Sequence, residues 1–377
     1  MMRQIIRCGL GTSKPCAEGR PPCRPMLMRR GPDGAGPSHV LWLVTMMFAL
    51  CVAPPAVHAA ERLQPVWPAP HPAWTQGKSS DAFLQEAGSG DPASGGFGGV
   101  RTNGRQFHEG IDIKALRHDR RGEATDSVFA ALDGVVRHVN SVPGKSSYGR
   151  YIVLEHPNQQ PAVYTLYAHL ASIAPGIRPG VTVRAGQVLG VMGRSASGYA
   201  IPKARAHVHF EIGLRLTDDF QSWYDWKKFG SRNEHGVYNG MNLLGTDPLA
   251  FFNACRAGEV ATMGDWFARM QPAVKFRIAT RRTPDFVQRY PSLVRKHLPM
   301  LIAGWEVECD WTGLPFRWTP LDVDAVRGMK PNEVRVLEVN EELRSRQKSK
   351  DLVIRRGGQW VPVGDLQTVL QLVFGLR

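Results

Sequence analysis

The chain has 377 residues, of which 43% are hydrophobic and 21% are charged. This composition is ordinary for a folded protein and excludes global disorder, and the length predicts two domains at roughly 100 to 200 residues each. The formal net charge of +14 predicts attraction to polyanions. Nucleic acid, an anionic membrane surface and an acidic cell-wall polymer all fit this charge, so charge alone does not choose among them.

An apolar run near the N-terminus predicts a signal peptide. Residues 40–52 follow Arg29 and Arg30 and lead to small residues that end at Ala59, which is the layout of a secretory leader. The run is shorter than the ~20 apolar residues that span a bilayer, so a retained anchor is the weaker alternative. We therefore expect cleavage after Ala59, removal of residues 1–59, and export to the periplasm, the cell envelope or the extracellular space without a stable membrane span.

The basic stretch before this apolar run is long for a leader. A start assigned too early would explain its length, with Met26 or Met28 as the true first residue. After the leader, residues 60–99 are rich in proline and glycine. Such a composition predicts a linker or a loosely wrapped arm.

Between residues 100 and 254 short apolar runs alternate with turn signals, and no long helical period appears. This pattern predicts a domain built mostly of strands. The clearest strands are expected at residues 127–139, 151–155, 162–170, 187–192 and 206–214. Residues 218–245 are expected to form a long loop or insertion with aromatic anchors, at Phe220, Trp223, Tyr224 and Trp226.

The first cluster of chemically useful side chains contains His108 and Asp112, with Gly110 between them. In an extended segment both side chains fall on one face, because side chains repeat every two residues. Imidazole nitrogen and carboxylate oxygen are both good zinc ligands. Alone the pair is weak evidence, since this spacing is common and usually indicates a surface hydrogen bond.

A second cluster lies on the predicted strand at residues 206–214, where His207, His209 and Glu211 share the face opposite the apolar positions. Two protonated imidazoles this close repel each other, which favours a metal or catalytic role over packing. A solvated polar face is the alternative. Another histidine, His169, lies on a different predicted strand, and by itself it would more often be a structural residue.

Beyond Cys255 the pattern changes to mixed helix and strand, so residues 255–377 are predicted to form a smaller domain, whose role is unknown. Its expected elements are a helix at 284–297, hairpins at 304–320 and 352–363, and a final helix at 364–375. Cys255 and Cys309 form an even pair in an exported chain. A disulfide and two buried free thiols are both open, because sequence does not show their separation.

Taken together, these segments resemble the M23 family of lysostaphin and LytM-type metallopeptidases. The resemblance spans about residues 101–252. It is carried by His-x-x-x-Asp at 108–112, Tyr-Ala-His-Leu at 167–170 and His-x-His-Phe-Glu at 207–211. It implies a mainly β fold, with an antiparallel sandwich or barrel-like peptidase domain at residues 100–254 followed by the mixed α/β domain. It also implies one Zn²⁺ held by His108, Asp112 and His209, with His169 and His207 as catalytic histidines.

The activity that the resemblance implies is zinc-dependent endopeptidase cleavage of peptide bonds in bacterial cell-wall peptidoglycan. Three protein ligands leave a fourth position for water, as in catalytic zinc sites. His207 is the better candidate to take a proton from that water, and His169 to hydrogen-bond the water or the oxyanion, although these roles are exchangeable. Glu211 lies either behind a ligand or in solvent.

The main alternative is a non-catalytic LytM-like scaffold that binds the cell wall or activates an amidase. Such a scaffold is expected to have lost metal ligands, whereas all five positions here carry suitable residues. A nucleic-acid-binding protein is disfavoured by the signal peptide and by the absence of a binding motif. We therefore expect peptidoglycan, and not nucleic acid, as the partner.

Overall fold

The computed structural model describes residues 62–295, 299–345 and 348–377. The predicted signal peptide, its cleavage after Ala59 and the alternative starts at Met26 and Met28 lie outside the described residues. The described residues all belong to one compact unit. None of the helices in the described ranges combines the length and the apolarity that a bilayer crossing requires.

The proline- and glycine-rich stretch packs against the rest of the unit as an arm. Leu63, Trp67, Trp74 and Phe83 are buried, and the two tryptophan rings stack with centroids 4.8 Å apart. Large apolar side chains between the prolines anchor this chain because their burial removes apolar surface from water. The arm also contains two short 3-10 helices, at Ser80–Ala82 and Pro92–Gly95.

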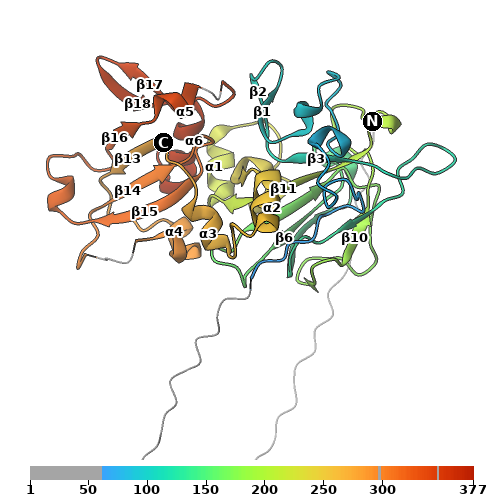
Figure 1. Cartoon of the computed structure of the whole chain (residues 1–377). Helices are drawn as coiled ribbons and strands as arrows, with labels where there is room; N and C mark the ends of the chain where they lie inside the picture. Colours follow the sequence, from blue (N-terminus) through green and yellow to red (C-terminus); the bar gives the residue numbers. More distant parts are fainter. Residues whose placement is uncertain (1–61, 296–298, 346–347) are drawn as a thin grey trace, which may run out of the picture. The chain divides into compact units, whose positions relative to one another are not determined.

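The first part of the unit is built from antiparallel strands (Figure 1). A seven-stranded sheet has the order β12-β11-β7-β6-β5-β9, and β3 also pairs with β11. Its strands are β3 (Ile111–Lys114), β5 (Gly134–Asn140), β6 (Tyr151–Glu155), β7 (Tyr164–Ala168), β9 (Thr182–Val183), β11 (His207–Arg215) and β12 (Leu243–Thr246). Two smaller sheets pair β1 (Gly98–Arg101) with β2 (Gln106–His108), and β4 (Ser127–Phe129), β10 (Val188–Val191) and β8 (Ser172–Ile173) in the order β4-β10-β8.

The expectation of a long loop at residues 218–245 is wrong at both ends, because Phe220–Lys227 forms helix α1 and Leu243–Thr246 forms strand β12. Phe220, Trp223 and Tyr224 are buried on one face of this helix. Their spacing of three and four residues is the helical period, so the aromatic anchors themselves carried the helix signal. Helices α2 (Pro248–Ala257) and α3 (Met263–Ala268) follow.

The C-terminal region has a four-stranded antiparallel sheet in the order β15-β14-β13-β16. Its strands are β13 (Val274–Ile278), β14 (Gly304–Cys309), β15 (Pro315–Leu321) and β16 (Val334–Val339). Strands β17 (Val353–Arg356) and β18 (Gln359–Pro362) form a separate two-stranded sheet. The helices of this region are α4 (Asp285–Arg289), α5 (Glu341–Ser345) and α6 (Gly364–Phe374). Both predicted hairpins and the final helix are confirmed. The helix expected at 284–297 is wrong: α4 has five residues and ends before Pro291, which lacks a backbone N–H and clashes with a preceding helical turn.

One hydrophobic core runs through both regions and joins α6 to the strands of the first part. Helix α6 lies beside α1 (Figure 1), and Trp223 Nε1 donates to Gln371 Oε1 at 3.2 Å. Cys255 and Cys309 are separate buried thiols. The mainly antiparallel β fold with a mixed C-terminal part is confirmed, whereas the division into two domains at residues 254 and 255, which lie within α2, stays a prediction.

A buried histidine in this core predicts how stability responds to pH. His156 is fully buried, with Nδ1 bonded to the Asp133 carbonyl and Nε2 to Thr165 Oγ1, both at 2.8 Å. Burial lowers the pKa of His156 from 6.5 to about 4. The unfolded chain therefore takes up a proton first, and His156 should cost the fold about 3 kcal/mol of unfolding free energy as pH falls from about 6.5 to about 4.

Urea unfolding at pH 7 and pH 4.5 measures this effect. The His156→Gln variant should lose less free energy of unfolding between the two pH values than the parent does. His118→Gln, at an exposed histidine, should match the parent. An equal loss in the parent and in His156→Gln would show that His156 has no part in the pH response.

Candidate active site

The register of strand β11 brings the three predicted segments together. His209 lies directly across from Asp112 of β3 on one side and from Ala168 of β7 on the other, which places His169 beside it. His108 ends strand β2 just before β3. All five predicted site residues are buried and line one cleft of about 230 Å³.

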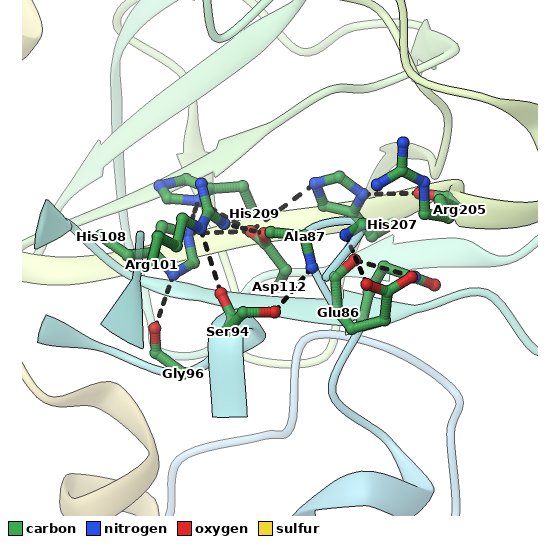
Figure 2. A network of polar contacts seen from close by, with 12 residues as sticks. Glu86, Ala87, Ser94, Gly96, Arg101, His108, Asp112, Arg205, His207 and His209 are labelled. Atoms are coloured by element: carbon green, nitrogen blue, oxygen red, sulfur yellow. Dashed lines mark hydrogen bonds and ion pairs between the residues drawn. The ribbon is translucent and has the colours of Figure 1, made fainter. Parts of the chain in front are cut away.

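Three polar atoms form the centre of this cleft. His108 Nε2 lies 3.1 Å from Asp112 Oδ1 and 2.9 Å from His209 Nδ1, and the last two atoms are 3.0 Å apart. Figure 2 shows these side chains converging from different strands. The three atoms thus form a nearly equilateral triangle, and these residues are the group of possible metal ligands in the described part of the chain.

The outer atoms of the ligand side chains fix which atoms face inward. His108 Nδ1 lies 2.6 Å from the Gly96 carbonyl, and His209 Nε2 lies 2.9 Å from Glu211 Oε1. Both acceptors demand an N–H, which assigns the lone pairs to His108 Nε2 and His209 Nδ1. With a cation bound, the triangle therefore offers two nitrogen lone pairs and a carboxylate oxygen as ligand atoms. Without a cation, burial lowers the pKa of His209, but its contacts with Asp112 and Glu211 outweigh burial and raise this pKa to about 10, so that Nδ1 then donates to Asp112 Oδ1.

Arg101 orients the carboxylate of this triangle. Its Nη2 lies 2.5 Å from Asp112 Oδ2, and its Nε donates to the Ser94 carbonyl at 3.0 Å (Figure 2). Oδ2 is therefore engaged and Oδ1 points to the histidines. Burial by itself raises the pKa of Asp112. In the acid range where Asp112 titrates, His108 and His207 are protonated, and their charges, together with hydrogen bonds from His108 and His209, hold this pKa well below its usual range.

A buried carboxylate stands behind His209. Glu211 is fully buried, and its Oε1 accepts from Tyr148 at 2.6 Å as well as from His209. Its Oε2 accepts from the Tyr164 hydroxyl at 2.9 Å. Glu211 therefore lies behind the candidate ligand His209 and not in solvent. From there its hydrogen bond orients the His209 ring.

His169 and His207 form a pair on one side of the triangle, with ring centroids 4.8 Å apart. Each Nδ1 lies 2.8 Å from a backbone carbonyl, that of Ser195 for His169 and that of Arg205 for His207. His207 Nε2 is buried, has no hydrogen-bond partner among the described residues, and lies 3.6 Å from Asp112 Oδ1. Burial lowers the pKa of both histidines, so both rings are neutral near pH 7 with a lone pair on Nε2.

Sequence reasoning missed three side chains of this site. Arg101, Tyr148 and Tyr164 make the contacts described above but lie outside the histidine motifs. Tyr164 belongs to the same predicted strand as His169, and its side chain falls on the face of Glu211. Arg101 and Tyr148 lie in segments with no local pattern, so only the fold brings them to the site.

Part of the chain matches the model of a known protein family. Residues 106–219, which include all five predicted site residues, match the model of peptidase family M23. We refer to residues 106–219, which match this family, as the M23 segment. The M23 segment begins at the strand that carries His108 and ends just before α1. No curated protein matches the chain.

Solved structures similar to the chain include M23 proteins. The catalytic domain of the prophage-encoded M23 protein EnpA from Enterococcus faecalis is 22% identical over 35% of this chain and 80% of that one, with a TM-score of 0.25. A zinc-containing peptidase from Vibrio cholerae is 25% identical over 41% of this chain and 36% of that one, with a TM-score of 0.25. The catalytic domain of lysostaphin from Staphylococcus simulans is 17% identical over 42% of this chain and 89% of that one, also with a TM-score of 0.25. The chain thus spans little more than a third of the Vibrio cholerae peptidase.

The buried network behind His209 in the M23 segment predicts a measurable stability loss. Tyr164→Phe removes the hydroxyl that satisfies Glu211 Oε2 and should lower the free energy of unfolding by about 1 to 3 kcal/mol. Tyr199→Phe is the control, since it removes an exposed hydrogen bond to the Ser147 carbonyl and should have little effect. Urea unfolding compares the two, and equal unfolding free energies would contradict the inferred network.

Proposed function

We propose that the chain is a zinc-dependent endopeptidase that hydrolyses peptide bonds in bacterial cell-wall peptidoglycan. The observation that carries this proposal is the triangle of inward-facing acceptors at His108, Asp112 and His209. The match of the M23 segment to a peptidase family supports the same function. The two neutral histidines beside the triangle supply the acid-base groups that peptide hydrolysis needs.

The donor set fits zinc. A tetrahedron with metal-to-ligand distances near 2.1 Å has edges of about 3.4 Å, close to the edges of 2.9 to 3.1 Å that join the three acceptors. Two imidazole nitrogens and one carboxylate oxygen are the ligand types of catalytic zinc sites with one open position. When bound, zinc supplies Lewis-acid polarisation of a carbonyl and lowers the pKa of water to about 7.

The chain's own residues supply the proton transfers. His207 Nε2 accepts a proton from the attacking water, since its Nδ1–H already donates to the Arg205 carbonyl. The resulting imidazolium then donates its Nε2 proton to the leaving amine. His169 has the same tautomer through Ser195, so while neutral it accepts a hydrogen bond from water. It donates to an oxyanion only after it takes up a proton itself.

The substrate is proposed from the family and the charge of the chain. M23 peptidases act on the cell wall, and a chain with net charge +14 is attracted to anionic polymers. Action on the wall requires export, which agrees with the expected leader. A non-catalytic scaffold would be expected to lack metal ligands, and here all three are buried side by side.

Zinc analysis and digestion of purified peptidoglycan test the proposed roles separately. The parent should hold about one zinc per chain, the number that one three-ligand site binds. His209→Ala should lose both zinc and activity. His207→Ala should keep its zinc while fragment release falls by about 10² to 10⁴-fold, the usual contribution of a general acid-base group.

His118→Ala changes an exposed histidine away from the cleft and serves as the matched control. It should keep both the zinc and the activity of the parent. If His209→Ala releases the same fragments as the parent, the assigned site is wrong. If the zinc-loaded parent releases none, the scaffold alternative replaces the proposed enzyme.

A further inference from the structure

A second hollow, of about 710 Å³, lies next to the candidate cleft. The two hollows share Glu109, Ser147 and Tyr148 in their walls. Glu109 follows the proposed ligand His108, and Tyr148 bonds Glu211 behind His209. The larger hollow therefore adjoins the cleft in which the chemistry is proposed. Its volume is in the range of ligand sites, about 300 to 1,000 Å³.

Two regions of the chain build this hollow. The M23 segment and the residues just after it supply one side, through Phe107, Tyr148 and Trp223 among others. The C-terminal region supplies the other side, through Thr312, Lys350, and Thr368 of α6 among others. The C-terminal region, which lies outside the family match, therefore forms part of the wall beside the candidate site.

The C-terminal wall is held against the strand that ends at His108. The Trp311 ring packs edge-on against Phe97 and Phe107, with centroids 5.7 and 5.8 Å apart. Lys350 Nζ lies 4.2 Å from the Phe107 ring centroid and 3.1 Å from Asp365 Oδ1. These contacts fix the spacing between the two walls, so the hollow is part of the folded unit.

The lining carries charges of both signs beside exposed apolar surface. Glu109 and Lys227 form no ion pair among the described residues, and Lys227 Nζ lies 5.5 Å from the Trp223 ring. Phe229 and Met241 are exposed by 44% and 42%. An unpaired carboxylate, an unpaired ammonium and apolar patches match a peptide that carries free amino and carboxyl groups.

We propose that this hollow is the second arm of the substrate cleft and holds the peptide strand of cross-linked peptidoglycan next to the bond that is cut. The proposal rests on the proposed function and extends it to the C-terminal region. In this arm, Lys227 binds a free carboxylate of the strand and Glu109 binds a free ammonium group. The C-terminal region supplies the opposite wall of this arm, through Thr312, Lys350 and Thr368, and so limits which part of the polymer fits there.

The test uses two matched pairs of variants in the full chain. Thr368→Trp fills the hollow from α6, and Gln367→Trp places the same ring on the neighbouring exposed position. Lys227→Glu reverses the charge inside the hollow. Lys228→Glu makes the same change in net charge at the next residue, which does not line the hollow.

Two readouts are measured for each variant, together with its zinc content. Retention on insoluble peptidoglycan is measured by co-sedimentation in the His207→Ala background, which keeps the polymer intact. Fragment release is measured in the parent background. We expect Thr368→Trp and Lys227→Glu to lose about tenfold or more in both readouts at unchanged zinc content, and each control to match its background.

The outcomes separate the two proposals. If the parent releases fragments and both hollow variants match their controls, the second arm is wrong and the proposed function stands. If the parent releases none but is retained, and the hollow variants lose retention, the hollow binds peptidoglycan without being an arm of a catalytic cleft, and the enzymatic proposal fails. A parent that neither binds nor cleaves peptidoglycan overturns both.

Discussion

Three possible ligand atoms lie about 3 Å apart at the centre of the cleft, and the rest of the site is arranged around them. His108 Nε2 and His209 Nδ1 face inward because the Gly96 carbonyl and Glu211 occupy their other nitrogens. Arg101 does the same for Asp112 by engaging the outer oxygen. Such a convergence of lone pairs in a buried place is unfavourable unless a positive charge is bound there.

Strand β11 is the element that makes the convergence possible. It pairs with β3 on one edge and β7 on the other, and the antiparallel register sets His209 opposite Asp112 and Ala168. The alternation of the strand sends Val208, Phe210 and Ile212 into the core and leaves the two histidines and Glu211 on the polar face. A slip of one residue would exchange these faces, so the apolar core itself enforces the geometry of the site.

Much of the site was predictable because its signals are local. Alternation identified β11. The spacing of His108 and Asp112 predicted one face of a single extended segment, whereas the structure places them on separate strands, β2 and β3, that bring both side chains to the same cleft. Arg101 and Tyr148 were not predictable, since long-range pairing brings them in and no pattern marks them. Helix α1 was not predicted, although its aromatic residues repeat at helical spacing. The helix expected at 284–297 was predicted too long, because Pro291 cannot continue the preceding helix. The buried tryptophans of the arm show that a proline-rich composition does not by itself predict a free linker.

The most direct measurement of the central claim is anomalous diffraction at the zinc absorption edge from crystals of the zinc-loaded chain. We expect one strong peak about 2.0 to 2.2 Å from each of His108 Nε2, Asp112 Oδ1 and His209 Nδ1. We also expect Asp112 Oδ2 to stay with Arg101. A zinc-loaded crystal with no peak among these three atoms, or with its zinc held by other residues, would contradict this claim.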